Sequence, residues 1–476
     1  MQEISLNSSR IILPLIFFQL ALFISLLGLF WLTDSSLDLY GNILFLVFLE
    51  CSFLAFIDTK DNIYKIFLFM MFLFNIALPI FVLFDLYSYP VGNRIMLTDG
   101  VTTVVSEKTL AETYQVLITM LMGTSVGWLM GKYNFDKRNN HSTYRRSTAI
   151  YSPRFVTNFK FLFYLLTMMV VYRNSALVYY ASVYDFIEVM HVRSVDLGAP
   201  WFFNFADVLH KVFGFVLLYQ SKNREEFIKY ATIFMIPFVI QALTGARGET
   251  IAMLIVILFI YSHFYSQLRF TKAIFYGVML FSASILIDAL RFSREIGDVL
   301  NNISVVDLVV LAITSTSGSI GVIAYTVELK DEFFNSVPFL FGYIQGIFSF
   351  SPNYTYEGIV NKNYLAQHIT YIIEPTKLFN GSTIGTAMGA EFYEFSNGSM
   401  SIIFILSMLL LYLSKFFISR LNSNIIMFYI GAIYIEALIL SPRGSIMKVF
   451  SKESIISMAI LIIMIYFVKS YKKIEN

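Results

Sequence analysis

Charged side chains are scarce in this sequence of 476 residues. Asp, Glu, Lys and Arg make up 14% of it, against about 25% in an ordinary soluble domain. Hydrophobic residues make up 57%, and the mean hydropathy is +0.69. This composition excludes a soluble enzyme and is typical of a protein that crosses a membrane many times.

Cysteine and histidine are also scarce. The single cysteine, Cys51, excludes an intramolecular disulfide and a cysteine-based metal site. The five histidines never fall in the paired spacing of a zinc enzyme, so we expect no metal and no other cofactor. A net charge of only +2 leaves no overall field to attract nucleic acid, which we exclude as a partner.

Long apolar runs dominate what remains. A spanning helix needs about 20 mostly apolar residues, because its backbone amides must be satisfied within the segment, and about twelve runs qualify. We predict spans at approximately 11–32, 40–57, 63–86, 112–131, 161–183, 205–220, 227–243, 250–267, 272–290, 401–418, 425–441 and 453–469. The fold class is therefore an all-α polytopic membrane protein. A bundle of about nine spans would occupy residues 1–290, and a segment of about three spans would occupy 401–476.

Basic residues gather in alternate connections between these spans, and the connection 132–160 is the richest in Lys and Arg. Cytoplasmic loops carry an excess of such residues, so these connections are predicted to face the cytoplasm. An even number of spans then places both termini in the cytoplasm.

The segment 291–400 is predicted to be one large external loop. Its apolar patches, 305–328 and 337–350, are short and are broken by Ser, Thr and Gly. We expect amphipathic or re-entrant helices at the outer surface. The alternative, an extra pair of spans within 305–350, would raise the number of spans to fourteen without changing the sides of the flanking helices.

Several arginines lie where few are expected, on the external side. A guanidinium stays charged and offers a rigid fork of donors, which suits capture of phosphate oxygens. Glycines beside two of them would let a bulky anion approach the backbone. The alternative is that each arginine pairs with a nearby carboxylate or reaches the membrane interface. The six are Arg173, Arg193, Arg247, Arg291, Arg294 and Arg443.

Ionisable residues inside the predicted spans are costly, at about 3 kcal/mol each near mid-bilayer. Asp207 and Lys211 lie four apart on one helix face and are predicted to neutralise each other. Glu50 is predicted to form a hydrogen bond between helices.

Three short motifs resemble those of a known family. They are Thr244-Gly-Ala-Arg-Gly-Glu-Thr250, the run Gly381-Ser-Thr-Ile-Gly-Thr-Ala-Met-Gly-Ala-Glu391 with its continuation to Gly398, and Ser441-Pro-Arg-Gly-Ser445. With about a dozen helices and one large late external loop, the sequence resembles the Wzy-type oligosaccharide repeat-unit polymerases, the O-antigen and capsular polysaccharide polymerases related to the O-antigen ligases.

The resemblance implies a GT-C-like, metal-independent glycosyltransferase in the bacterial cytoplasmic (inner) membrane. The donor would be a growing glycan on undecaprenyl diphosphate, and the acceptor a single lipid-linked oligosaccharide unit at the outer face. A chain-length-regulating co-polymerase would be a partner. Two alternatives stay open: a flippase or transporter for the lipid-linked oligosaccharide, and an O-antigen ligase.

This chemistry needs cations for the departing diphosphate and a base for the acceptor hydroxyl. The cations are predicted to be Arg247, Arg291 and Arg443, with Arg173, Arg193 and Arg294 as second choices. Glu391 is the predicted base, and His368 is the second candidate. The loop tyrosines Tyr354, Tyr356 and Tyr393 are candidates to stack on sugar rings.

Overall fold

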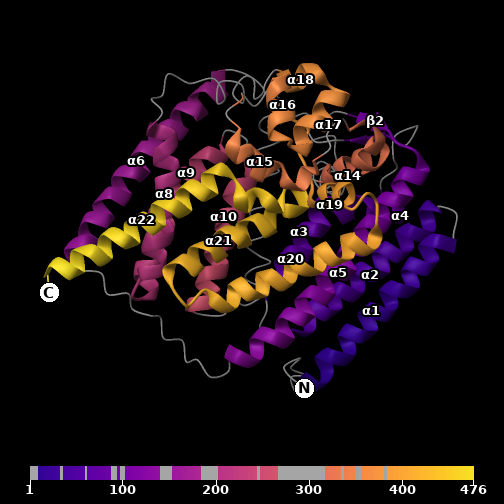
Figure 1. Ribbon diagram of the computed structural model, residues 1–476, viewed down its shortest axis with the longest axis horizontal. Helices are drawn as coiled ribbons and strands as arrows, with labels where there is room; N and C mark the ends of the chain where they lie inside the picture. Colours follow the sequence, from indigo (N-terminus) through magenta and orange to yellow (C-terminus); the bar gives the residue numbers. More distant parts are fainter. Residues whose placement is uncertain are drawn as a thin grey trace, which may run out of the picture. The chain divides into compact units, whose positions relative to one another are not determined.

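The structure of this chain is a computed structural model (Figure 1). It describes residues 9–32, 36–58, 62–86, 94–96, 102–139, 153–183, 202–243, 247–265, 317–333, 337–349, 351, 355–379 and 383–475. The chain divides into two compact units. Unit 1 comprises Met1–Ser142, Ile303–Ser419 and Ala437–Lys448, and unit 2 comprises Thr143–Asn302, Arg420–Glu436 and Val449–Asn476.

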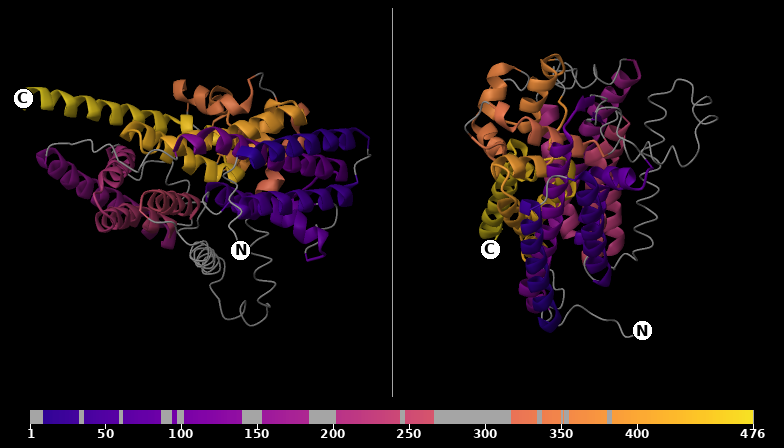
Figure 2. Two further views of the ribbon diagram at one scale, coloured as in Figure 1. Left: turned by 90° about the horizontal axis from the view of Figure 1, so that it is seen from below. Right: turned by 90° about the vertical axis from the view of Figure 1, so that its right-hand side faces the viewer.

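Long helices form the body of unit 1. Helices α1 (Ser9–Leu32) and α2 (Leu37–Ile57) both pack along α5 (Glu107–Asn139), as Figures 1 and 2 show. Gln19 of α1 donates a 2.6 Å hydrogen bond to Glu50 of α2, so the predicted interhelical role of Glu50 is confirmed.

A row of glycines brings α5 close to α20 (Met400–Arg420). Gly123, Gly127 and Gly131 recur every four residues, and a β-carbon added at Gly127 would collide with the backbone of Met408. Small residues at this spacing let two helix backbones approach closely, which is the usual way that helices associate inside a membrane.

The third helix of unit 1 contains a turn of π-helix. It runs as α3 (Ile63–Met71), η1 (Phe72–Ile76) and α4 (Ala77–Leu83). Pro79 of α4 has no backbone N–H to donate, and a local π turn is one way for a helix to adjust to that gap. Polar atoms around η1 gain partners elsewhere in unit 1: Ser317 Oγ donates to the Leu73 carbonyl (2.8 Å), and Asn75 Nδ2 donates to the Pro442 carbonyl (3.1 Å).

Short elements complete unit 1. The only strands among the described residues, β1 (Arg94–Met96) and β2 (Thr102–Val104), form an antiparallel hairpin. The described parts of 291–400 fold into short helices, drawn in orange in Figures 1 and 2. These are α14 (Ser319–Glu328), η3 (Lys330–Glu332), η4 (Phe339–Phe341), α15 (Gly342–Phe348), α16 (Tyr356–Lys362), α17 (Leu365–Ile373), α18 (Pro375–Phe379) and α19 (Met388–Phe395). The longest, α14, has 10 residues, about half the length that a span needs.

Unit 2 is built from longer helices around an aromatic core. His210 of α8 is fully buried and lies between the rings of Phe163 and Phe234, whose centroids are 5.3 and 5.1 Å away. Helix α8 packs on α6, α9 and α22, and α9 packs on α10. The helices are α6 (Pro153–Val183), α8 (Phe202–Gln220), α9 (Arg224–Ala242), α10 (Arg247–Phe264), the first part of α21 (Ile425–Leu440) and α22 (Lys452–Glu475).

Within the described residues, six helical segments are long and apolar enough to cross a membrane. They are Ile11–Leu32, Leu37–Ile57, Ile63–Leu83, Phe159–Tyr180, Met400–Arg420 and Ile425–Arg443. The prediction of a helical, multi-pass membrane protein is confirmed. Helices also occupy the predicted spans covered by α5, α8, α9, α10 and α22, whereas the predicted span 272–290 lies outside the described residues.

Candidate functional site

Glu391 lies in the first turn of α19 and is 2% exposed. Two hydroxyl groups donate to its carboxylate: Ser445 Oγ to Oε2 (2.6 Å) and Thr386 Oγ1 to Oε1 (3.2 Å). Gly385, whose φ is 100°, lets the chain turn in the left-handed region just before Thr386. The carboxyl group is therefore buried and held through both of its oxygens.

The surroundings of Glu391 disfavour its charged form. Burial raises the pKa of its carboxyl group to about 8; the bonds from Ser445 and Thr386 oppose this rise, and the nearby Glu394 adds to it. Burial also raises the pKa of Glu394 to about 7, although its Oε2 accepts a 3.0 Å bond from the backbone N–H of Phe339. Two carboxyl groups on one helix thus titrate near neutral pH, as catalytic acids and bases often do.

The bond from Ser445 to Glu391 joins two of the three sequence motifs, although these residues are 54 positions apart. The segment 441–445 is held in turn by η1, because Asn75 donates to the Pro442 carbonyl. Arg443 is exposed, and its guanidinium lies 5.7 Å from the ring centre of Phe74. Arg443 is therefore a cation in the same short segment as Ser445, which binds the buried carboxyl group of Glu391.

His368 occupies a different setting, inside the layer of short helices. It is fully buried on α17, its Nε2 contacts the Ile359 carbonyl at 3.3 Å, and the ring of Phe339 meets it edge-on at 4.6 Å. Burial lowers the pKa of the imidazole to about 4, so the ring is neutral at physiological pH. His368 thus packs against the ring of Phe339, and the backbone N–H of Phe339 donates to Glu394.

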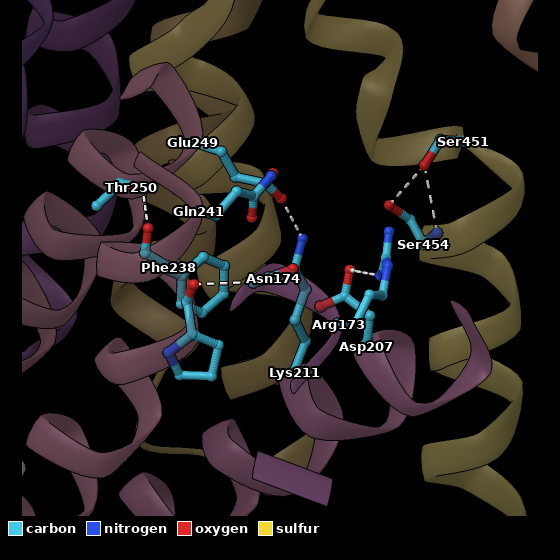
Figure 3. A network of polar contacts seen from close by, with 11 residues as sticks. Arg173, Asn174, Asp207, Lys211, Phe238, Gln241, Glu249, Thr250, Ser451 and Ser454 are labelled. Atoms are coloured by element: carbon cyan, nitrogen blue, oxygen red, sulfur yellow. Dashed lines mark hydrogen bonds and ion pairs between the residues drawn. The ribbon is translucent and has the colours of Figure 1, made fainter. Parts of the chain in front are cut away.

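Unit 2 contains a second polar cluster, shown in Figure 3. Arg173 Nη1 lies 3.4 Å from Asp207 Oδ2, and Lys211 forms an ion pair with Glu249. Asp207 and Lys211 attract each other, as predicted, but each forms its ion pair with a residue of another helix. Residues of α6, α8 and α10 are joined in this way, and Gln241 of α9 also donates to Glu249 at 3.4 Å.

The sequence analysis selected Arg173 as a candidate cation but did not predict the ion pair of Lys211 with Glu249. The sequence contained one signal for it, because Glu249 is an acidic residue in the first turn of α10 within one of the three motifs. Within the described part of the chain, no group of three His, Cys, Asp or Glu side chains could hold a metal ion.

The sequence model of the family described as O-antigen polysaccharide polymerase Wzy matches residues 11–475. The chain belongs to this family. No curated protein and no solved structure matches it.

Membership of the Wzy family confirms the resemblance seen in the motifs. The chain is an O-antigen repeat-unit polymerase, with the glycosyltransferase-type activity of its family, and acts on lipid-linked oligosaccharide repeat units. It is a multi-pass membrane protein.

The structure accounts for only some of the predicted site residues of this Wzy polymerase. Glu391, His368 and Arg443 lie in unit 1, and Arg173 lies in unit 2. Arg247 begins α10, but its side chain lies outside the described residues. Arg193, Arg291, Arg294 and Tyr354 also lie outside them.

Proposed function

We propose that this polymerase transfers the growing glycan from undecaprenyl diphosphate to the terminal hydroxyl of a new lipid-linked unit, with Glu391 as the general base. The observation that carries the proposal is the buried carboxyl group of Glu391, whose pKa is raised to about 8 and whose oxygens accept bonds from Ser445 and Thr386. A carboxylate with a raised pKa is a stronger base than an ordinary one, and it still ionises near physiological pH.

The reaction needs one proton transfer and one displacement. The acceptor oxygen attacks the anomeric carbon of the donor while its proton passes to Glu391. The bond from that carbon to the diphosphate oxygen breaks, and undecaprenyl diphosphate leaves with the bonding electrons. The two hydroxyl donors, at 2.6 and 3.2 Å, hold both oxygens of the carboxylate in a fixed position.

Cations would bind the departing diphosphate. In unit 1, Arg443 supports this role because it is exposed and lies two residues from Ser445. We propose Arg247 and Arg291 as further ligands, with Arg173, Arg193 and Arg294 as second choices.

Glu391 is preferred to His368 as the base. The Nε2 of His368 is engaged with the Ile359 carbonyl, and a pKa of about 4 makes the imidazole a weak base. His368 remains the second candidate, since it packs against Phe339 beside Glu394.

The setting that we propose for this reaction is the outer face of the bacterial cytoplasmic membrane. We propose twelve to fourteen spans in a GT-C-like arrangement, an external segment 291–400 between the bundles 1–290 and 401–476, and cytoplasmic termini. Support comes from the basic connections, of which 132–160 is the richest. An alkaline phosphatase fused at residue 360 should be active if 291–400 is external, and inactivity there would overturn this topology.

We also propose that the reaction is independent of metal ions and that a co-polymerase sets the chain length. Arginines would take the place of a metal at the diphosphate. Joining by the purified protein should continue in the presence of a chelator, and loss of joining that Mg²⁺ restores would contradict metal independence.

The test of the proposed base is Glu391→Gln, examined by gel analysis of surface glycan in a strain that lacks the native gene. Single repeat units attached to core should replace the long ladder, because the amide cannot accept the proton. Glu107→Gln is the matched control, since Glu107 is exposed at the start of α5, and it should give a normal ladder. A full ladder from Glu391→Gln would remove Glu391 from catalysis.

The same gel separates the alternative functions. Bare core in this variant would indicate that the protein is a ligase, and lipid-linked units trapped inside the cell would indicate that it is a flippase.

A further inference from the structure

Three aromatic side chains form a row on the outer helices of unit 1. Tyr356 of α16, Tyr371 of α17 and Phe379 of α18 lie with successive ring centroids 5.9 and 6.0 Å apart. Tyr356 is 56% exposed and Phe379 is 48% exposed. These three residues, the aromatic stripe, connect three consecutive helices through contacts between their rings.

The buried core of the helix layer is formed mainly by other residues. The inward side of α17 is supplied by other residues, since Leu365, His368 and Ile369 are fully or almost fully buried. A single exposed ring, such as that of Phe348, is ordinary in a folded protein. Exposed rings joined by contacts with one another form a larger apolar patch, and such patches mark a ligand site or an interface.

Polar groups on the helix that carries Tyr356 favour a sugar over a lipid chain. On α16, Glu357 accepts a 3.1 Å bond from Ser351, and Asn361 donates to the same serine hydroxyl at 3.0 Å. Glu357 and Asn361 are exposed. A sugar ring stacks its C–H face on the negative face of an aromatic ring while its hydroxyls bond to carboxylate and amide groups. An acyl chain would desolvate these polar groups without replacing their hydrogen bonds.

The stripe is also linked to the candidate base through a short path. Thr370, the neighbour of Tyr371, is buried, and its Oγ1 accepts a 2.9 Å bond from the backbone N–H of Ile384. Two residues further along, Thr386 donates to Glu391. The helix that carries the middle ring is thus fixed to the loop that leads to the reacting carboxyl group.

We propose that the aromatic stripe is a secondary binding site for the growing glycan, contacting sugar residues remote from the bond being formed. This inference rests on the polymerase function but not on Glu391 as the base. A glycan held there stays near the reaction between successive joinings, so it is extended several times before it dissociates. The stripe would therefore help to set the length of the product.

The test uses the full chain in lipid vesicles with purified lipid-linked repeat units. Tyr356→Ala combined with Phe379→Ala should lower later joinings about fivefold more than the first joining, because each lost ring contact weakens glycan binding several-fold. The product ladder then ends at shorter lengths. Tyr356→Phe should keep the long products, since it preserves the ring.

Phe348→Ala is the matched control. Phe348 is 78% exposed on α15 and is not part of the stripe, so its loss should leave the ladder unchanged. An unchanged ladder from the double variant would overturn the proposal. An equal loss of first and later joinings would also overturn it, because a membrane contact or a folding role affects every joining alike.

A binding measurement with lipid-free glycan, released from the carrier by mild acid, gives an independent readout. The wild-type protein should bind this probe, and the double variant should bind it at least about fivefold more weakly. Equal binding by the two proteins would contradict the proposal. Glu391→Gln separates the two ideas: normal joining by that variant would remove the proposed base while leaving the stripe intact.

Discussion

The hydrogen bond from Ser445 to Glu391 makes a quantitative prediction. In Ser445→Ala the 2.6 Å donor to Oε2 is lost, while Thr386 still donates to Oε1. A hydrogen bond to a charged group contributes about 1.5–3 kcal/mol. Because the bond from Ser445 lowers the pKa of Glu391, its loss should raise that pKa, and about 1.4 kcal/mol corresponds to one pH unit. The midpoint of joining activity should therefore move up by about one to two pH units.

The assay is the initial rate of joining by the reconstituted protein, measured from about pH 6 to pH 10. If Glu391 is the base, the rate of the wild-type protein should rise with pH until the carboxyl group ionises, near pH 8. At pH 7, Ser445→Ala should be about ten- to a hundredfold slower, since the ionised fraction falls tenfold for each pH unit. Ser445→Thr keeps a hydroxyl and should restore much of the rate.

Two outcomes would refute this reasoning. A midpoint that stays in place or moves down, in a variant that still joins units, would show that Glu391 is not the titrating base. Ser445 Oγ also accepts a 3.1 Å bond from the Met447 backbone, so Ser445→Ala disturbs the local fold as well. Thr386→Val removes the donor to the other carboxylate oxygen, Oε1 of Glu391. It should also move the midpoint of joining activity to higher pH, by less than Ser445→Ala does, because its 3.2 Å bond is longer.

Three further predictions concern charge and packing. Arg443→Gln should abolish long glycan chains on gels while membrane levels of the protein stay normal, and a full ladder would exclude Arg443 from diphosphate binding. Gly127→Val should lower the melting temperature in detergent, because overpacking against the α20 backbone costs about 1–3 kcal/mol or more; an unchanged melting temperature would contradict the close contact. Lys211→Met should destabilise unit 2 by about 2 kcal/mol, since it leaves Glu249 without its cation, and Glu249→Gln in the same chain should recover much of the loss. If the double variant melts no higher than Lys211→Met, the two residues are not coupled.

Local patterns were sufficient to predict several of the long helices and to select Glu391 as a candidate. Apolar runs identified α1, α2 and α20 because burial in lipid requires a helix of that length and composition. A short motif singled out Glu391, and the structure gives it the burial that raises its pKa. The ion pairs could not be predicted in this way. Asp207 and Lys211 attract each other, but each forms its ion pair with a residue of another helix, and cross-helix neighbours have no signature in sequence spacing.

The sequence by itself determined the class of this protein, its membrane-crossing helices and its family, since each follows from composition or from residues close together in the chain. Only the tertiary structure decided that Ser445 meets Glu391 and that Asn75 of η1 binds the Pro442 carbonyl in the segment 441–445. It likewise brought the rings of Tyr356, Tyr371 and Phe379 into contact. These contacts depend on how helices distant in sequence pack together, and burial within that packing gives a carboxyl group the pKa of a base.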